Sequence, residues 1–447
     1  GATTLTGTIG FNNVDLGGGV NFGSASTING LLQINAGGFC NTNGPFYADG
    51  STLQYNIDYS LSTEWYASAA SGQGVPYNVV INGGNVYFAN TAFVYRQIRN
   101  DLTINASKIF ALSETAGGDL RIGGDFINNG TFTANGRSVL FNGSAAQDIS
   151  GSGTGDFAYV DINNGNGVTL SRNITIGNQL KLSNGNLTLG INSVSLGSSS
   201  LLNSGGLGSV SDFSNTNMVI TNGTGTLNRT VAASAIVFPI GYSATYYNPV
   251  TITNTGTSRT FSVYAKSTPT NAGYNVKYVN CFWNITPNGA EVNSSLIFQW
   301  NAAQEDPSFA RGDATLHIGR WTGTVWDPKL ATLGGSGPYT ATATGFTAFS
   351  EFGVGSNGAL PVELTSFNAA MRNGLVDLKW ETATEVNNYG FEVERKTASA
   401  DWSKIGFVEG HNSTNSPKYY SYSDKPEGTG KIAYRLKQID NDGQFEY

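Results

Sequence analysis

The chain contains few of the side chains that carry out chemistry in active sites. His317 and His411 are its only histidines, and Cys40 and Cys281 are its only cysteines. Catalysis usually requires a histidine, a cysteine or clustered carboxylates with shifted pKa values. The sequence has no HExxH, G-x-S-x-G or P-loop motif. We therefore expect both histidines to be ordinary strand or loop residues, and we predict no catalytic residue, no cofactor, no metal site and no enzyme activity.

Two groups of carboxylates have spacings that would permit chemistry. Glu381 and Glu385, in "ETATE", could form an acid/base pair, but they fall at the end of an expected strand, which favours surface charge. Asp440, Asp442 and Glu446, in "IDNDGQFE", could supply oxygen ligands to calcium. Their spacing is too short for an EF-hand loop, and a hairpin turn at the Asp-Gly pair also accounts for them. Surface charge and a turn are the favoured interpretations.

Aromatic side chains offer a different function, because an exposed ring can stack on the face of a sugar. The competing interpretation is core packing, since aromatic residues dominate the cores of β-sandwiches. The candidate glycan contacts are Trp65, Tyr66, Trp321 and Trp326, with Tyr246 and Tyr247 as further aromatic residues.

The 447-residue chain carries little charge. Asp, Glu, Lys and Arg make up 12% of it, about half the usual share, while glycine contributes 58 residues. Because 39% of the residues are apolar and 12% are aromatic, we expect a folded, β-rich protein with many tight turns and no general disorder. The net charge of −7 and the lack of basic tracts exclude a nucleic-acid partner. No apolar run approaches the roughly 18 to 20 residues that span a bilayer.

The beginning of the chain and its cysteines bear on its compartment. Gly1 leads directly into β-like sequence, "GATTLTGTIGFNN", and no signal peptide is visible. This fits a mature chain whose leader has been removed. Cys40 and Cys281 do not indicate a metal site, and distance in sequence does not decide whether they form a disulfide.

Residues 1–210 are repetitive without a fixed period. Short alternating runs, such as "LRI", "VLF" and "LTL", are separated by Asn-Gly pairs at Asn129-Gly130, Asn135-Gly136, Asn142-Gly143, Asn164-Gly165 and Asn184-Gly185. Each unit is too short to bury its own apolar face, whereas stacked units would bury a continuous core. The favoured prediction is a β-helix-like solenoid with parallel strands. A meander of Asn-Gly hairpins is the competing fold, because Asn-Gly turns strongly favour hairpins.

Two further domains are expected after this region. Residues 211–356 contain strands of mixed length with dense aromatics, which predicts an antiparallel β-sandwich. Charge then rises abruptly, since 23 of the 55 charged residues lie from Pro361 onward, and a Gly/Ser/Asn-rich linker precedes that point. Residues 357–447 fit a fibronectin type III-like module, with Trp380 in an early strand and Tyr434 where such sandwiches place a corner tyrosine. The predicted fold class is all-β, a parallel solenoid followed by antiparallel sandwiches.

Several segments resemble a known family. "LPVELTSFNA", "ETATEVNNYGFEVERK", "WSKIGFVEGHNST" and "YRLKQIDNDGQFEY" resemble a module near the C-terminus of Bacteroidetes proteins exported by the type IX secretion system. "FWNITP" and "FTAFSEFGVGS" resemble the segment that usually precedes it, and "TINGLLQINAGGF" resembles the surface-protein repeats before that. The resemblance implies secretion, exposure at the cell surface and an adhesive or structural role. In that family a final strand continues beyond "FEYS" and a sorting domain follows, whereas this sequence ends at Tyr447.

We therefore expect a secreted cell-surface structural or adhesive protein, with a self-assembling extracellular fibre subunit as one form of it. A truncated last strand would leave an unpaired edge that recruits other chains, and the residues of this predicted assembly edge are Gln444, Phe445, Glu446 and Tyr447. Its partners would be further copies of the chain or other cell-surface components, including glycans. The alternative from another class is a carbohydrate-binding protein or glycan-active enzyme on a β-helix scaffold.

Overall fold

The computed structural model shows an all-β fold with a parallel β-solenoid of about ten turns and antiparallel sheets, which confirms the predicted fold class. It describes all residues except 1–2, 67, 70, 89–93, 116, 198–200, 204–212, 271–276, 291, 308, 312–314, 357–363, 384, 399, 415, 427–429, 442 and 444. Contacts divide the chain into two compact units, Gly1–Lys266 with Ile285–Ser294 and Ser267–Asn284 with Ser295–Tyr447. The expected boundaries at 210/211 and 356/357 fall on or beside undescribed residues.

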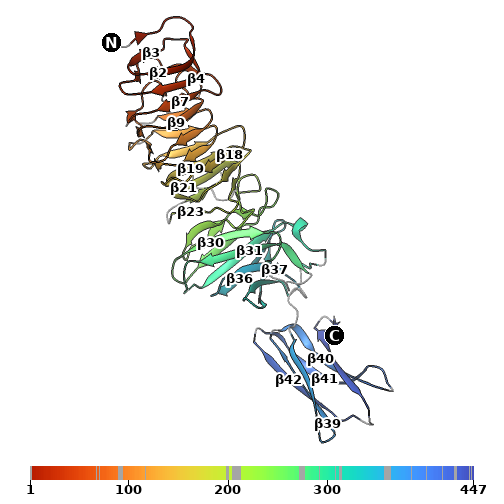
Figure 1. Cartoon of the computed structure of the whole chain (residues 1–447). Helices are drawn as coiled ribbons and strands as arrows, with labels where there is room; N and C mark the ends of the chain where they lie inside the picture. Colours follow the sequence, from red (N-terminus) through yellow and green to blue (C-terminus); the bar gives the residue numbers. More distant parts are fainter. Residues whose placement is uncertain are drawn as a thin grey trace. The chain divides into compact units, whose positions relative to one another are not determined.

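The first unit is built from parallel strands that stack coil upon coil (Figure 1). One 12-stranded sheet contains β2 (Gly10–Leu16), β4 (Thr27–Ile34), β6 (Phe46–Tyr47), β7 (Thr52–Tyr55), β9 (Asn78–Ile81), β12 (Leu102–Ile104), β15 (Phe126–Asn128), β18 (Gln147–Ser150), β20 (Val168–Leu170), β22 (Leu187–Thr188), β25 (Val219–Ile220) and β28 (Ile240–Gly241). The parallel pairing therefore continues beyond residue 210, through β25 and β28.

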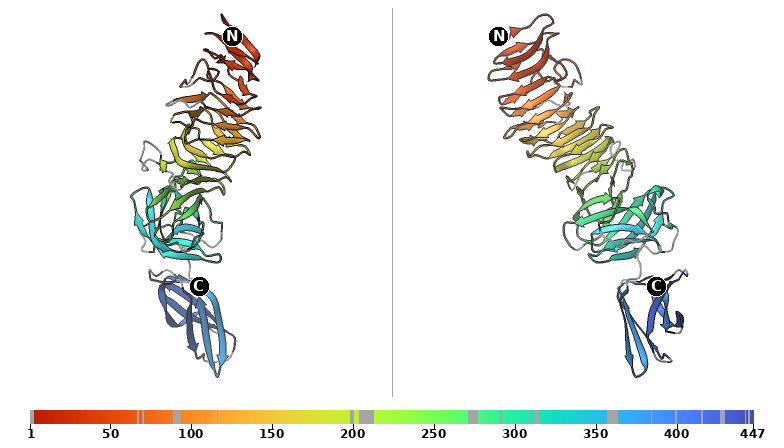
Figure 2. Two further views of the ribbon diagram at one scale, coloured as in Figure 1. Left: turned by 90° about the vertical axis from the view of Figure 1, so that its left-hand side faces the viewer. Right: turned by 45° about the vertical axis from the view of Figure 1, so that its right-hand side comes forward.

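The other sides of the coils are formed by three further sets of parallel strands. One set contains β1 (Thr3–Thr4), β3 (Gly19–Asn21) and β5 (Phe39–Cys40), and another contains β8 (Tyr59–Ser60), β10 (Val86–Tyr87), β13 (Ile109–Ala111) and β16 (Thr131–Thr133). The third contains β11 (Tyr95–Ile98), β14 (Asp119–Ile122), β17 (Ser138–Phe141), β19 (Phe157–Asn163), β21 (Ile174–Asn184), β23 (Val194–Leu196), β24 (Leu201–Asn203) and β26 (Leu227–Val231). The views in Figure 2 show the same coil-by-coil stacking.

The register of these strands places like residues above one another. Leu32 pairs with Leu53, Leu53 with Val79, and Val79 with Leu102, and all four side chains are buried. Because side chains alternate between the two faces of a strand, the neighbouring residues of the same strands point outward. Each coil thus buries one apolar row against the coils on either side, as a solenoid core requires.

The Asn-Gly pairs form corners of the coils and do not make hairpins. Asn135 and Gly136 both adopt positive φ, 48° and 71°, as the two-residue turn type expected for hairpins would. They connect β16 to β17, however, and these strands belong to different parallel sheets. The hairpin meander is therefore wrong, because the same backbone geometry here turns the chain from one side of the coil to the next.

A stack of buried aromatic side chains lies in the core of the solenoid. Trp65 lies parallel to Phe110 at a centroid distance of 6.1 Å, and Phe110 in turn meets Phe132 at 6.2 Å. Phe126 and Phe157 extend the stack at 5.2 Å from one another. Aromatic pairs at these distances add to the stabilisation that burial of their surface provides.

Antiparallel pairing begins at the end of the first unit. β26 pairs antiparallel with β30 (Arg259–Lys266), and β27 (Ile236–Phe238) pairs antiparallel with β29 (Val250–Asn254). The strands that follow along the chain are β31 (Tyr278–Pro287), β32 (Ser294–Trp300), β33 (His317–Trp321), β34 (Trp326–Leu330), β35 (Thr332–Gly334), β36 (Tyr339–Phe346) and β37 (Glu351–Gly355), with a short 3₁₀ helix at Ala302–Gln304. β37 pairs antiparallel with both β31 and β33.

The C-terminal module consists of two antiparallel sheets around one core. One sheet has the order β38 (Leu364–Arg372), β39 (Leu375–Thr382) and β42 (Lys418–Asp424). The other has the order β41 (Ser403–Thr414), β40 (Glu385–Thr397), β43 (Ile432–Asp440) and β44 (Phe445–Glu446). Trp380, Phe391 and Tyr420 pack together between the sheets, with Trp380 stacked on Tyr420 at 5.5 Å.

The inner row of the solenoid should dominate its stability. We expect Leu102→Ala to lower the free energy of unfolding by about 2 to 5 kcal/mol, because it leaves a cavity between two coils. Thr103→Ala on the outer face of the same strand should cost about 0.5 kcal/mol or less. Urea unfolding of both variants beside the parent chain measures the difference. Equal effects of the two substitutions would contradict the assigned register.

Candidate functional site

The predicted assembly edge forms the last strand of the C-terminal module. Phe445 pairs with Ile439 and Glu446 with Gln438, so β44 lies at the edge of its sheet. Gln444 lies outside the described residues, and Tyr447 follows β44 directly. β44 is thus paired on one side with β43, and its other side is the edge of the sheet.

The aromatic side chains of this segment pack on cations of β43. The Arg435 guanidinium lies 3.8 Å from the ring centre of Tyr447 and 4.4 Å from that of Trp402. Arg435 also donates to Glu394 at 2.7 Å, which fixes its plane. Lys437 lies 4.2 Å from the ring centre of Phe445. Cation–π contacts of this kind each contribute about 0.5 to 1 kcal/mol at exposed sites, so they hold the last strand against its sheet.

β44 is shorter than β43 and pairs with only part of it. β40 pairs with β43 along its length, from Ile432 to Asp440. On the other side of β43, β44 covers only Gln438 and Ile439 within the described residues. Within the described residues, no strand pairs with residues 432–437 on that side. Strand edges accept an added strand from another chain through backbone hydrogen bonds.

The candidate glycan contacts differ in how far their side chains are buried. Trp65 is fully buried, and its indole N–H donates to the carbonyl of Gln97 at 3.0 Å, so it presents no face to a sugar. Trp326 is also buried, within a cluster that includes Phe282. Tyr66 and Trp321 are half-buried. The Tyr66 hydroxyl donates to the carbonyl of Thr42 at 2.7 Å.

Trp321 and Trp326 form one aromatic pair across the β33–β34 hairpin. Their ring centres are 5.6 Å apart, and they are direct partners in the strand register. Trp326 belongs to the core, because it packs on Phe282. The four candidate glycan contacts are thus divided between the solenoid, which holds Trp65 and Tyr66, and this hairpin.

A buried polar cluster inside the solenoid was not predicted from the sequence. Glu64 is fully buried and accepts hydrogen bonds from Tyr55 at 3.1 Å and Tyr59 at 3.2 Å. The Ser62 N–H donates to the same carboxylate at 2.9 Å. Burial raises the pKa of Glu64 and outweighs these hydrogen bonds and the nearby Arg96. The hydrogen-bond partners of Glu64 are close to it in sequence, but its burial depends on the stacking of coils and the nearby cation, Arg96, comes from a later coil.

A row of carboxylates on the outer face of the solenoid, the acidic ladder of Asp101, Asp125 and Asp148, was also not predicted. Asp101 accepts the Asp125 N–H at 2.8 Å, and Asp125 accepts the Asp148 N–H at 2.7 Å. Each carboxylate therefore satisfies a backbone donor in the next coil. Burial and the neighbouring carboxylates of Asp101 and Asp148 raise the pKa of Asp125, which outweighs its hydrogen bond. Spacings of 24 and 23 residues, one coil each, are the signal that could have revealed this ladder.

A second polar network lies inside the C-terminal module. Glu385 is buried and accepts hydrogen bonds from the hydroxyls of Tyr420 and Thr382 and from the His411 N–H. His411 Nδ1 lies 2.8 Å from the Tyr420 hydroxyl. Burial acts to raise the pKa of Glu385, but the hydrogen bonds prevail and hold that pKa below its ordinary value. The expectation of surface charge is therefore wrong for Glu385.

The structure does not bring Glu381 and Glu385 together as an acid/base pair. Glu381 is only partly buried and lines a hollow on the outside of the β38–β39–β42 sheet. Glu385 belongs to the other sheet and points into the core of the module. The two carboxylates therefore act in separate environments.

The remaining histidine and both cysteines among the candidate residues are buried. His317 begins β33 and is buried, as expected for a strand residue. Cys40 and Cys281 are both buried free thiols, so the chain has no disulfide between them. Within the described residues, which omit Asp442, no group of three or more His, Cys, Asp or Glu side chains is arranged to hold a metal ion. No helix in that part of the chain is long and apolar enough to cross a membrane.

Comparisons with protein-family models, with curated proteins and with solved structures found no match to this chain.

The acidic ladder predicts a gain in stability when one charge is removed. Because folding raises the pKa of Asp125, its stability contribution is present below the unfolded pKa of about 3.9 and is lost as pH rises through the folded value. Asp125→Asn keeps the acceptor for Asp148 and should gain about 0.2 to 1 kcal/mol at pH 7. The gain should vanish toward pH 3.5 in chemical unfolding experiments.

Asp119→Asn is the matched control for this substitution. Asp119 also accepts a backbone N–H from the next coil, from Ser138 at 2.8 Å. Its register partner in the preceding coil is Tyr95 and its donor in the next coil is Ser138, so neither of these neighbours carries a carboxylate. A gain for Asp119→Asn equal to that of Asp125→Asn would show that repulsion within the ladder is not the cause.

The Glu385 network predicts the opposite pH dependence. A folded pKa below the unfolded value of about 4.3 means that the stability contribution is present above that value and is lost as pH falls through the folded pKa. Tyr420→Phe removes a donor to the buried carboxylate and should cost about 1 to 3 kcal/mol at pH 7, with a smaller cost at pH 3. Thermal and urea unfolding measure both. Tyr419→Phe, at an exposed position next along β42, should be neutral, and an equal loss there would exclude this explanation.

Proposed function

We propose that this protein is a secreted cell-surface structural or adhesive protein and that it assembles through copies of itself into extracellular fibres. The observation that carries the proposal is the solenoid, in which about ten turns stack by parallel pairing. A stack of this kind contacts only its neighbours along its axis, so its surface is repetitive and extended. Repeated polar ladders on that surface suit a structural element or a platform for adhesion.

The resemblance to type IX secretion substrates supports the proposed location. The segments that carry it, from "ETATEVNNYGFEVERK" to "YRLKQIDNDGQFEY", cover most of the C-terminal module. We propose on that basis that the chain is exported by this route and displayed outside the cell. The order of the two sheets, with Trp380 in the core and Tyr434 donating to Asp424 at 2.7 Å, supports a fibronectin type III-like assignment of the module.

Strand addition beside β44 is the proposed route to self-association. A strand from a second copy could pair with residues 432–437, where the described structure has no strand on that side. Backbone hydrogen bonds would provide the affinity, and Phe445 and Tyr447 beside that stretch would provide apolar contacts. A contact between an edge of one copy and a different surface of the next does not close on itself, so it would generate filaments.

The glycan-binding alternative is favoured by the aromatic candidates that retain an exposed surface. Tyr66 and Trp321 are half-buried, and each keeps part of its ring accessible. Binding of glycans is compatible with an adhesive role, because a surface protein can attach to another cell by binding the polysaccharides of that cell.

We expect fibre formation to depend on concentration and on the β44 edge. Sedimentation velocity and negative-stain electron microscopy of the parent chain, over a hundredfold range of concentration, should show growing filaments. Phe445→Lys places a second ammonium group beside Lys437, and charges on an edge strand oppose strand addition. This variant should need at least a tenfold higher concentration to assemble.

Met371→Lys is the control for added charge, because Met371 is exposed on β38, an edge strand of the other sheet of the same module. It should assemble as the parent chain does. A parent chain that stays monomeric at every concentration would refute fibre assembly. Filaments that are indifferent to Phe445→Lys would refute the assigned edge.

A further inference from the structure

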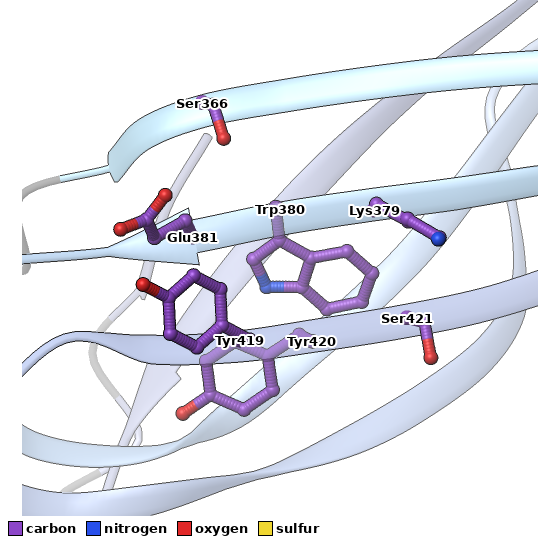
Figure 3. A pocket seen from close by; sticks show the side chains of 7 residues that line it. All are labelled: Ser366, Lys379, Trp380, Glu381, Tyr419, Tyr420 and Ser421. Atoms are coloured by element: carbon purple, nitrogen blue, oxygen red, sulfur yellow. The ribbon is translucent and has the colours of Figure 1, made fainter.

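The outer face of the β38–β39–β42 sheet has a hollow that the proposed assembly does not use. Its volume is about 360 Å³, and its lining includes Ser366, Lys379, Glu381, Tyr419 and Ser421 (Figure 3). The strand register accounts for this grouping. Ser366 pairs with Glu381 and Glu381 with Tyr419, while Lys379 pairs with Ser421. Two adjacent rows across three strands thus place one aromatic ring among four polar groups.

The ring of Tyr419 is unusually exposed for its size. Its exposed fraction is 75%, whereas Tyr420, next along the strand, is 7% exposed and belongs to the core. The alternation of a β-strand explains the contrast, because consecutive side chains point to opposite faces. Tyr419 therefore contributes nothing to the core, and its large apolar face is available for a ligand.

The polar groups around this ring have no side-chain partners in the described structure. Among the described residues, the carboxylate of Glu381 and the ammonium group of Lys379 form no ion pair. One row further along, by contrast, Ser423 donates to Asp377 at 2.7 Å and the polar groups satisfy each other. The hollow thus lies beside the last row in which the polar side chains bond to each other.

The opposite sheet of the same module pairs its charges with one another. Glu392 accepts from Lys404 at 2.6 Å and from Lys437 at 3.3 Å. Glu394 accepts from Arg435 at 2.7 Å. The module therefore has one outer face whose charges are mutually neutralised and one hollow where a carboxylate, an ammonium group and two hydroxyls surround an exposed ring.

We propose that this hollow is a carbohydrate-binding site for a neutral, hexose-based oligosaccharide, with Tyr419 as the stacking platform. The apolar face of a pyranose ring would lie on Tyr419. Its hydroxyls, which both donate and accept, would donate to Glu381 and accept from Lys379, while the serine hydroxyls serve in either direction. One positive and one negative side chain leave the site without net charge, which favours a neutral sugar over a polyanion.

The size of the hollow sets the expected strength of binding. A volume of about 360 Å³ is at the lower end of ligand sites, so it accommodates one or two sugar rings of a longer chain. A site of this size, open to solvent, should bind with a dissociation constant on the order of 0.1 to 1 mM. Repetition of the site in an assembled array would strengthen attachment to a polysaccharide through multivalency. The site itself does not require assembly.

Titration of the full chain with four oligosaccharides tests this inference. Cellohexaose, maltohexaose, mannohexaose and chitohexaose are each added up to 10 mM, with isothermal calorimetry and saturation-transfer NMR as readouts. At least one should bind saturably. Tyr419→Ala should weaken that binding at least tenfold, and Glu381→Gln should weaken it at least threefold. Tyr389→Ala is the matched control, because Tyr389 is 52% exposed on the other sheet of the same module, and it should bind as the parent chain does.

Unfolding temperatures within 2 °C of the parent would show that these surface variants remain folded, as substitutions of exposed residues usually do. Absence of saturable binding by all four oligosaccharides would overturn the proposal. Equal losses in Tyr419→Ala and Tyr389→Ala would also overturn it. Self-association that disappears in Tyr419→Ala, without oligosaccharide binding, would assign this face to a second copy of the chain. Failure here would leave the fibre proposal standing, since that proposal depends on the β44 edge.

Discussion

Parallel, in-register stacking of short strands is the interaction on which the rest of the solenoid depends. Each coil is too short to bury its apolar residues alone, so every coil takes its core and its backbone hydrogen bonds from its neighbours. This requirement explains why Leu53, Val79 and Leu102 lie in one buried row. It also explains the outer ladders, because any residue that recurs once per coil meets its own kind 4.7 to 4.9 Å away.

That stacking has an electrostatic cost where the recurring residue is charged. Asp101 and Asp125 satisfy backbone donors in successive coils, but the carboxylate of Asp125 is also repelled by those of Asp101 and Asp148. A chain with only 12% charged residues avoids most such encounters. Low charge in this protein is thus a consequence of repetition, and Asn, Ser and Thr supply hydrogen bonds in the ladders without repulsion.

The C-terminal module differs from the solenoid in its charge content and in which residues its strands bring together. It holds 23 of the 55 charged residues, and its antiparallel strands bring unlike residues opposite one another. One outer face uses this freedom to pair acids with bases and cations with aromatic rings, as Arg435 does with Glu394 and Tyr447. Around Tyr419 the same freedom leaves an exposed ring among unpaired polar groups. The two faces therefore differ: on one the charged groups pair with each other, and on the other the ring and polar groups remain free to contact a ligand.

The sequence predicts the fold class because alternation and turn residues are local signals. It could not distinguish a coil corner from a hairpin at Asn135-Gly136, since both use positive φ and only the partner strand differs. Trp65 was a candidate contact residue because its burial depends on rings from later coils. Glu385 was expected to be a surface charge, and Tyr419 was not among the candidate glycan contacts, for a similar reason. The face on which such a side chain lies is set by the sheet that its strand joins.

Hydrogen–deuterium exchange, followed by mass spectrometry as the concentration of the chain is raised, tests the central claim most directly. If copies join by strand addition beside β44, the backbone amides of residues 432–437 and of β44 gain protection as assembly proceeds. The peptides that cover β38 and the solenoid coils keep their exchange rates. New protection confined to the solenoid, or no concentration dependence at 432–447, would contradict the account.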